Sequence, residues 1–192
     1  MGTPKEWKRL RTGDATDYTI LRIREDLVSD PRTGAGRPRV IIEAPDWVNI
    51  IPVTIDEQVV LVRQFRFGIW SPALEIPGGM VDPGEDPLSA AVRELEEETG
   101  YVPAGRVIPL GKVHPNPAFL TNACHSFLAL GCERTGKASP ELDEDIQVSL
   151  EPRPRIAELL RTGAITHALV ACAFLLERLY WERETSYEPE RP

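Results

Sequence analysis

The sequence predicts an α/β fold, in which a sheet is accompanied by a small number of helices. Runs rich in β-branched residues occupy much of the chain between residues 17 and 70, and three later stretches carry helical signals. The 192 residues suffice for one domain of ordinary size, or for a core domain with a small appendage.

Composition narrows the class of protein. A hydrophobic share of 42% and a charged share of 27% are those of a soluble globular protein, and no apolar run is long enough to span a membrane. The polar N-terminus lacks the apolar segment of a secretory signal. Three cysteines, Cys124, Cys132 and Cys172, stand in no ligand or redox spacing, so we expect reduced thiols in a cytoplasmic protein.

The net charge of −8 argues against a nucleic-acid partner, because such binders need a basic surface. A small polyanionic substrate remains compatible with it, since a bound divalent cation can reverse the local field.

The first elements are strands. Residues 17–43 hold two β-rich runs separated by a turn in which Pro31, Gly34 and Gly36 cluster. Residues 47–68 hold two more, joined at residues 55–58 in the manner of a hairpin. A loop rich in glycine and proline follows Trp70 and contains one short strand.

A helix is predicted over residues 87–98. Asp86 suits the N-cap, Pro87 suits the first helical position, and Gly100 suits a left-handed C-terminal residue. Helical spacing predicts a core stripe, made of Leu88, Ala91, Val92 and Leu95.

The remaining chain is expected to alternate strands and helices. Two strands lie on either side of a proline-rich loop at residues 114–119, and an acidic loop precedes a strand that starts near Gln147. Helices are expected over residues 156–161 and from His167 to about Arg183, before a flexible tail at residues 185–192.

Three carboxylates share one face of the predicted helix at residues 87–98. Glu94, Glu97 and Glu98 stand at i, i+3 and i+4, where like charges repel unless something offsets them. Oxygen ligands of this kind hold Mg²⁺ together with substrate phosphates. Arg93 is spaced to hold Glu97, and Glu85 is placed to hold Arg93.

A solvated acidic face is the alternative, since most helices rich in glutamate have one. The preceding Pro77-Gly78-Gly79 segment favours the metal site, because glycine lets the backbone approach closely and a loop carbonyl can then join the metal ligands.

These residues belong to a longer pattern, G-x5-E-x7-R-E-U-x-E-E-x-G-U, where U is bulky and apolar or aromatic. All nine positions match, and a chance match is on the order of one in ten million from average residue usage. The matching residues are Gly79, Glu85, Arg93, Glu94, Leu95, Glu97, Glu98, Gly100 and Tyr101. The pattern is the Nudix box, and the sequence resembles the Nudix hydrolase superfamily.

Further segments are similar to the branch that hydrolyses ADP-ribose and nucleoside diphosphate sugars. They run from about Trp47 to Leu176 and include VVLVRQFRFG, ALEIPGG and DEDI. The resemblance implies an α/β/α sandwich around a mixed sheet, with a Nudix domain at residues 46–184. It also implies a homodimer in which the strand extension at residues 1–45 packs on the partner or exchanges with it.

The implied reaction splits X-diphosphate-Y compounds into a nucleoside monophosphate and a sugar phosphate, with two or three Mg²⁺ ions for which Mn²⁺ can substitute. By position, Glu94 and Glu98 match the main metal ligands, and the Gly78 carbonyl matches another, although many relatives carry alanine there. Glu97 matches a further ligand or the group that aligns the water. Arg93 is assigned, like Glu97, to the catalytic residues.

The resemblance also assigns residues outside the box. Arg66 matches a residue that contacts the diphosphate, for which a guanidinium fork is suited, although a surface arginine at a strand end is the alternative. Glu75 matches an acid in the metal or water network beside the substrate. Glu144 matches a mobile glutamate of the acidic loop that acts as a base or as a late metal ligand. A one-residue slip would select Asp143 instead, and a plain solvent loop is the alternative.

Aromatic residues give weaker signals. Trp47 is assigned a substrate-stacking role, whereas Trp7 and Phe119 are expected in the core, where aromatics usually lie. The three histidines are expected to pack or to face solvent. The NPAF segment at residues 116–119 differs from the loop of strict ADP-ribose enzymes, which favours broader nucleotide-sugar specificity.

Two other functions remain open. The substrate could be a nucleoside triphosphate or a dinucleoside polyphosphate, or the chain could be a ligand sensor without activity. The sensor is disfavoured, because such modules usually lose glutamates of the box and all are present here.

Overall fold

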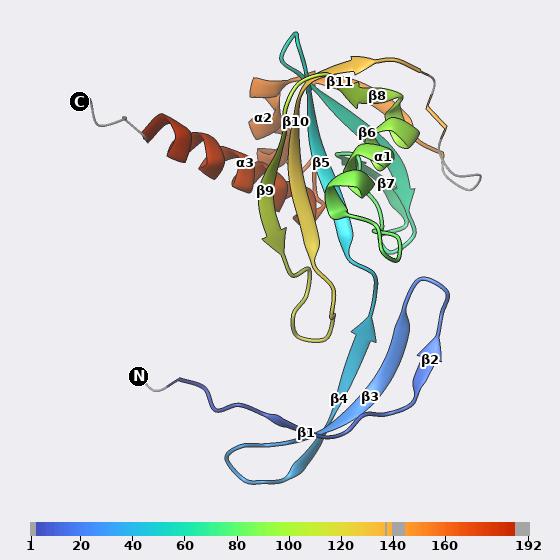
Figure 1. Cartoon of the computed structure of the whole chain (residues 1–192), viewed down its shortest axis with the longest axis vertical. Helices are drawn as coiled ribbons and strands as arrows, with labels where there is room; N and C mark the ends of the chain where they lie inside the picture. Colours follow the sequence, from blue (N-terminus) through green and yellow to red (C-terminus); the bar gives the residue numbers. More distant parts are fainter. Residues whose placement is uncertain (1–2, 137, 140–144, 187–192) are drawn as a thin grey trace. The chain divides into compact units, whose positions relative to one another are not determined.

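The computed structural model describes residues 3–136, 138–139 and 145–186 (Figure 1). The chain forms two compact units. Met1–Pro45 and His114–Ala123 make up the first, called the strand unit below, and Asp46–Val113 and Cys124–Pro192 make up the second, called the sandwich unit.

The strand unit holds four antiparallel strands. β3 (Arg22–Ser29) pairs with β1 (Lys8–Arg11) near one end and β2 (Ala15–Asp17) near the other, while β4 (Gly36–Glu43) pairs along its whole length. The predicted turn between β3 and β4 is present, with Gly34 at a φ of 74° and its N–H bonded to the Asp30 carbonyl at 2.7 Å.

The sandwich unit is built on a seven-stranded mixed sheet. Its strands are β5 (Trp47–Thr54), β6 (Gln58–Arg66), β7 (Ser71–Glu75), β8 (Tyr101–Pro103), β9 (Val107–Val113), β10 (Cys124–Arg134) and β11 (Gln147–Pro152). The order is β11-β6-β5-β10-β8, with β7 on β6 and β9 on β10. β5 and β10 are parallel, and the other pairs are antiparallel.

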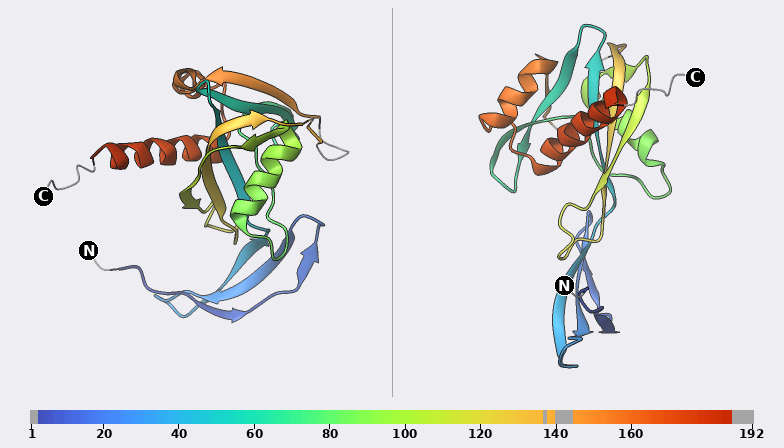
Figure 2. Two further views of the ribbon diagram at one scale, coloured as in Figure 1. Left: turned by 45° about the horizontal axis from the view of Figure 1, so that its top comes forward. Right: turned by 90° about the vertical axis from the view of Figure 1, so that its left-hand side faces the viewer.

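Helices cover both faces of this sheet (Figure 2). α1 (Pro87–Thr99) packs through Ala91 and Leu95 against a cluster that includes Ile50 of β5. α2 (Ile156–Arg161), after the 3₁₀ turn η1 (Arg153–Arg155), and α3 (Ala168–Ser186) pack in a second cluster that includes Ile51. Because neighbouring residues of a strand face opposite sides, β5 supplies both cores. The predicted α/β/α sandwich with an N-terminal strand extension is confirmed.

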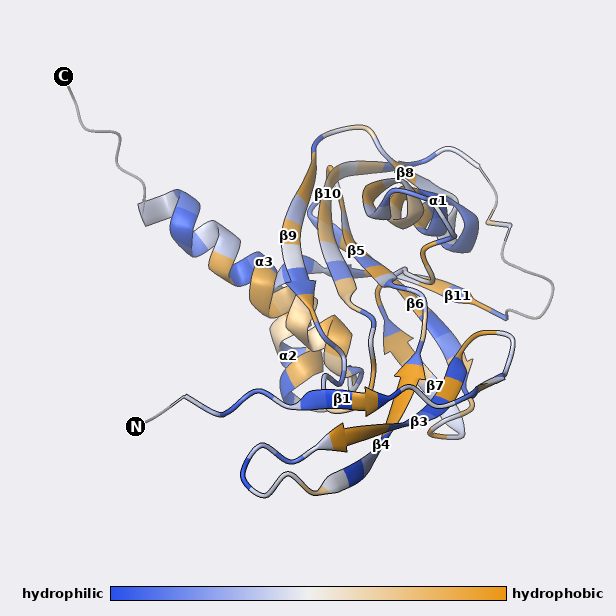
Figure 3. Cartoon of the chain, turned by 60° about the horizontal axis from the view of Figure 1, so that its bottom comes forward, coloured by the Kyte–Doolittle hydropathy of each residue, from blue (hydrophilic) through white to orange (hydrophobic). Residues whose placement is uncertain are grey.

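The hydropathy of α3 changes along its length, from apolar in its first half to hydrophilic near its C-terminal end (Figure 3). Val170, Ala173 and Phe174 of the first half are buried in the core. The helix starts one residue after the predicted position and ends at Ser186 rather than near Arg183.

The core stripe predicted for α1 is partly wrong. Leu88 is 39% exposed and Val92 is only half-buried, whereas Ala90, Leu95 and Thr99 are fully buried. Compared with the orientation that the predicted stripe implies, the helix is rotated about its axis so that Glu98 is also buried. The Glu98 carboxylate therefore contacts the glycine loop rather than solvent.

The acidic loop at residues 140–144 and the tail at residues 187–192 lie outside the described residues. Within the described part of the chain, no helix combines the length and apolar character needed to cross a membrane.

Candidate active site

The loop between β7 and α1 lies directly against β5. Ile50 N–H donates to the Pro77 carbonyl at 3.0 Å, and Val48 N–H donates to the Gly79 carbonyl at 2.9 Å. The intervening Gly78 carbonyl takes no part in this pair of bonds. A Cβ at Gly78 would lie 2.3 Å from the Val48 carbonyl oxygen, so this approach requires glycine.

α1 begins immediately after this loop, and its ends match the predicted signals. The Asp86 carboxylate accepts from Leu88 N–H at 3.1 Å and from Ser89 N–H at 3.2 Å. Pro87 occupies the first turn, and Gly100 closes the helix at a φ of 72°. These caps fix where the helix starts relative to the loop, and therefore where its carboxylates lie.

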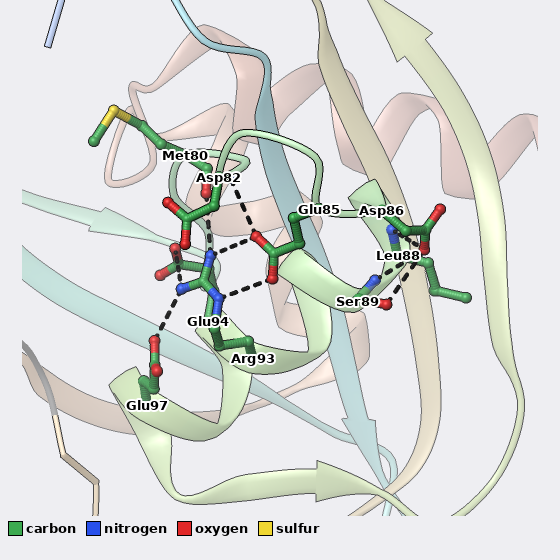
Figure 4. Close-up of polar contacts among 9 residues, drawn as sticks. All are labelled: Met80, Asp82, Glu85, Asp86, Leu88, Ser89, Arg93, Glu94 and Glu97. Atoms are coloured by element: carbon green, nitrogen blue, oxygen red, sulfur yellow. Dashed lines mark hydrogen bonds and ion pairs between the residues drawn. The ribbon is translucent and has the colours of Figure 1, made fainter.

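Arg93 lies at the centre of an ionic network on α1 (Figure 4). Its Nε and Nη2 donate to the two oxygens of Glu85, both at 3.0 Å, and its Nη1 donates to Glu94 and Glu97, both at 3.0 Å. Nη2 also donates to the Met80 carbonyl at 3.2 Å. The predicted contacts of Arg93 with Glu97 and of Glu85 with Arg93 are confirmed.

Arg93 and Glu85 each stabilise the charged form of the other. The hydrogen bonds from Arg93 hold the pKa of the Glu85 carboxyl below its usual range, and the Glu85 carboxylate in turn raises the pKa of Arg93 above its ordinary value. Arg93 therefore remains a cation and offsets the repulsion among the glutamates of α1.

The three glutamates of the predicted metal site differ in burial. Glu98 is 3% exposed and accepts from Gly78 N–H at 3.1 Å. The Glu94 side chain is 15% exposed and occupies the space beside Gly79, where a Cβ would lie 2.4 Å from its carboxylate. The Glu97 side chain is 45% exposed. Exposure of the three carboxylates thus increases from Glu98, at the loop, through Glu94 to the half-exposed Glu97.

Among the described residues, no three acidic, histidine or cysteine side chains are already gathered as a metal cluster. Arg93 binds Glu94 and Glu97, and Glu98 is turned toward a backbone N–H. The donor set still fits a hard divalent cation, because carboxylates and the neighbouring Gly78 carbonyl offer only oxygen. Glu94, Glu97, Glu98 and Gly78 are the residues that could hold it.

A cavity of about 320 Å³ adjoins the glycine loop. Its lining residues are Trp47, Val48, Asn49, Arg66, Glu75, Ile76, Gly78, Gly79, Met80, Cys124, His167, Leu169 and Val170. The structure therefore brings Arg66, Glu75 and Trp47 to the same cavity as Gly78. Arg66 and Glu75 form two hydrogen bonds, from Nε to Oε1 at 3.0 Å and from Nη2 to Oε2 at 2.9 Å.

Several cavity residues were not predicted as site residues. Asn49 is a buried polar side chain inside an apolar strand, which was a visible signal, and its Nδ2 donates to the Leu169 carbonyl at 3.2 Å. His167 precedes α3 and joins the same cavity, which no local pattern shows. Burial raises the pKa of the Cys124 thiol to about 12, so the thiol stays protonated at neutral pH.

The other predictions have different outcomes. Glu144 and Asp143 lie outside the described residues. Trp7 and Phe119 are exposed rather than in the core, which corrects the expectation for both. The Arg39 guanidinium lies 5.1 Å from the centre of the Trp7 ring, a contact that explains how an aromatic side chain is accommodated at the surface.

Comparison with known proteins identifies the family. Residues 45–166 match the NUDIX domain. The chain is 33% identical over 150 residues to the methanol dehydrogenase activator of Bacillus methanolicus, covering 78% of this chain and 80% of that protein. It is 34% identical over 130 residues to the ADP-ribose pyrophosphatase of Bacillus subtilis (strain 168), covering 65% of this chain and 69% of that protein.

A solved structure described as an ADP compounds hydrolase superposes with a TM-score of 0.83, covering 96% of this chain and 98% of that one. At 20% identity this likeness supports the fold alone. The resemblance inferred from the box is confirmed, and the chain belongs to the NUDIX family.

Proposed function

We propose that this protein is a Mg²⁺-dependent hydrolase of the diphosphate bond in ADP-ribose or nucleoside diphosphate sugars. The observation that carries the proposal is the placement of the α1 glutamates, ordered by Arg93, beside a glycine loop that borders a cavity containing Arg66. Similarity to the ADP-ribose pyrophosphatase of Bacillus subtilis supports the substrate class, as does 49% identity over 63 residues to the ADP-sugar pyrophosphatase of Mus musculus, which covers 31% of this chain and 29% of that protein.

In this proposal Glu94, Glu98 and the Gly78 carbonyl hold the metal, with Glu97 as a further ligand or the group that aligns water. Bound Mg²⁺ would neutralise the diphosphate and lower the pKa of a water molecule. Arg66 binds the diphosphate through its guanidinium. We assign to Trp47, which lines the same cavity, the role of stacking on the substrate. Glu98 is buried against the loop and Glu94 is largely buried, so the positions of these two proposed metal ligands are restricted by the surrounding protein.

The reaction consumes one water. Its oxygen bonds to one phosphorus, the bridging P–O bond breaks, and the bridging oxygen leaves with the other phosphate. The proton passes to a carboxylate, for which we propose Glu97, held by Arg93, or Glu144 of the acidic loop. No covalent intermediate on the protein is needed, so positioning and charge stabilisation account for catalysis.

The test is a substrate panel of ADP-ribose, ADP-glucose, GDP-mannose and UDP-glucose with Mg²⁺. Alkaline phosphatase added afterwards releases phosphate from the products but not from the capped diphosphates. We expect turnover that EDTA abolishes. dGTP, followed by product chromatography, covers the triphosphate alternative, and consumption of dGTP alone would overturn the substrate class. Mg²⁺ binding without turnover of any substrate would support a sensor.

We further propose a homodimer. The strand unit carries exposed apolar side chains, among them Leu10 of β1, Ile20 between β2 and β3, and Val40 of β4. Exposed apolar surface of this kind marks a protein interface in many soluble proteins. Light scattering should report twice the monomer mass, and Leu10→Glu or Val40→Glu should shift it toward the monomer. A wild-type monomer at all concentrations would contradict the proposal.

The cytoplasm is the compartment we propose, because all three cysteines are free, as expected for thiols kept in a reducing environment.

A further inference from the structure

Glu75 and Arg66 form a paired contact at the edge of the cavity. Arg66 ends β6 and Glu75 ends β7, and the two strands are antiparallel neighbours, with Val62 opposite Glu75 and Ser71 opposite Arg66. Each carboxylate oxygen has its own nitrogen partner, at 3.0 and 2.9 Å. This is the two-point geometry that fixes the plane of a guanidinium as well as its position.

The two partners are unequally buried. Glu75 is 4% exposed, whereas the Arg66 side chain is 41% exposed. A carboxylate that is buried so deeply requires a partner, because its desolvation would otherwise be very unfavourable. Glu75 is therefore the fixed member of the pair and Arg66 the member it holds. The contact uses the Nε and Nη2 edge of the guanidinium, so the Nη1 end is directed away from Glu75.

We propose that Glu75 is a positioning residue, which fixes the Arg66 guanidinium for the substrate's diphosphate and offsets part of its charge, and that it is not a metal ligand. The identity of the anion rests on the proposed function. Both oxygens of Glu75 are engaged by Arg66, which gives the carboxylate a structural task that needs no metal.

The proposal predicts two opposite effects of neutralising Glu75. Loss of the Glu75 charge removes the offset that this carboxylate provides, so Arg66 should attract an anion more strongly and a diphosphate should bind more tightly without metal, by about three- to tenfold. Loss of one of the two hydrogen bonds loosens the guanidinium, so turnover should fall by about ten- to a hundredfold. A purely structural role would not produce a rise in affinity together with a fall in turnover.

A second buried ion pair provides the matched control. Glu177 of α3 is buried and accepts from Arg153 Nε at 3.1 Å, and neither residue lines the cavity. Glu177→Gln should therefore lower thermal stability in the way a lost buried pair does, without altering ligand binding or turnover.

The experiment compares wild type, Glu75→Gln, Glu75→Asp and Glu177→Gln. Calorimetry with ADP in EDTA gives the metal-free dissociation constant, and assays with ADP-ribose give kcat, KM and the Mg²⁺ concentration for half-maximal activity. Glu75→Gln should bind ADP more tightly, turn over more slowly and need the same Mg²⁺ concentration. Glu75→Asp keeps the charge, so it should bind ADP like the wild type and recover part of the turnover.

Other results would overturn the proposal. A higher Mg²⁺ requirement in Glu75→Gln would make Glu75 a metal ligand. ADP binding no tighter than that of the wild type, including no detectable binding by either protein, would refute the charge offset. If the wild type hydrolyses no diphosphate while Glu75→Gln still binds ADP more tightly, the proposed function fails and the positioning of Arg66 stands.

Discussion

Arg93 is the residue through which the acidic face of α1 becomes compatible with a folded helix. Glu94, Glu97 and Glu98 repel one another at helical spacing, and Arg93 bonds directly to the first two. Glu85, before the helix, anchors the other edge of the guanidinium. The free protein thus holds its glutamates in defined rotamers, which reduces the ordering needed when a cation binds.

The role of Glu97 in the reaction can be tested by substitution, because the neighbouring Glu96 is exposed and provides a matched control. Glu97→Gln should lower kcat by about 10²- to 10⁴-fold, as expected for loss of a group that aligns or deprotonates water. Glu96→Gln should leave kcat and the melting temperature near the wild-type values. Equal activity of the two variants, measured with saturating ADP-ribose and Mg²⁺, would remove Glu97 from the reaction.

Spacing along the sequence was sufficient to predict the contacts of Arg93 with Glu97 and Glu85, since both partners lie within about two turns of it. It could not predict that Glu98 would be buried, because its partner, Gly78 N–H, is 20 residues away in the chain. Nor could it show that both Glu75 oxygens would bind Arg66, which depends on the register of β6 with β7.

At the scale of elements, the two glycines of the loop have different tasks. A side chain at Gly78 would meet the backbone of β5, 2.3 Å from the Val48 carbonyl oxygen. At Gly79 the three atoms nearest to an added Cβ all belong to the end of the Glu94 side chain, which can move. The first contact holds the loop on the sheet, and the second holds a proposed metal ligand at the loop.

Gly78→Ala and Gly79→Ala should therefore separate stability from activity. Gly78→Ala should lower the free energy of unfolding by about 1–3 kcal/mol, the usual cost of forcing atoms into a filled space. Gly79→Ala should keep most of the stability but displace Glu94, so it should raise the Mg²⁺ concentration for half-maximal activity. Denaturant unfolding and metal titration of both variants measure this, and the same loss of stability in both would contradict the distinction.

The elements themselves show where prediction from sequence stops. Capping residues located both ends of α1, because caps are local chemistry. The side of α1 that faces the core was predicted less well, since Leu88 fits the apolar spacing yet lies exposed, while the small Ala90 is buried. Tertiary contacts, here the burial of Glu98 against the loop, decide the rotation of a short helix. The cavity joins β5 to the start of α3, 120 residues apart at the Asn49–Leu169 bond, and no local signal reports such a pairing.

On the scale of the molecule, buried charged side chains occur in both units. The sandwich unit combines them with two apolar clusters, on the two faces of its sheet. The described residues of the strand unit belong to neither cluster, so its buried charges carry more weight. Arg24 and Asp26 are both buried and hydrogen-bonded at 2.9 Å, and Asp30 is buried with Arg32 as its partner at 3.0 Å. Carboxylates with such partners make stability depend on pH.

Acid should therefore weaken the protein through these carboxylates. Hydrogen bonds from the Arg32 side chain and backbone lower the pKa of Asp30 from 3.8 to about 2, and the hydrogen bond from Arg24 lowers the pKa of Asp26. A depressed folded-state pKa contributes stability that is complete above the unfolded pKa and disappears as the pH falls through the folded one. For Asp30 this window runs from about pH 4 to about pH 2.

Asp30→Asn isolates this contribution. At pH 7 the variant should unfold at a lower denaturant concentration than the wild type, because the charge that Arg32 stabilises is absent. Since protonation removes the same charge from the wild type, the difference between the two proteins should shrink as the pH falls from about 4 toward 2. Asp14→Asn, an exposed position in the same unit, should match the wild type at pH 7. Denaturant midpoints at pH 7, 4 and 2.5 measure the trend, and a difference that stays constant across this range would mean that Asp30 stabilises the strand unit through its shape rather than its charge.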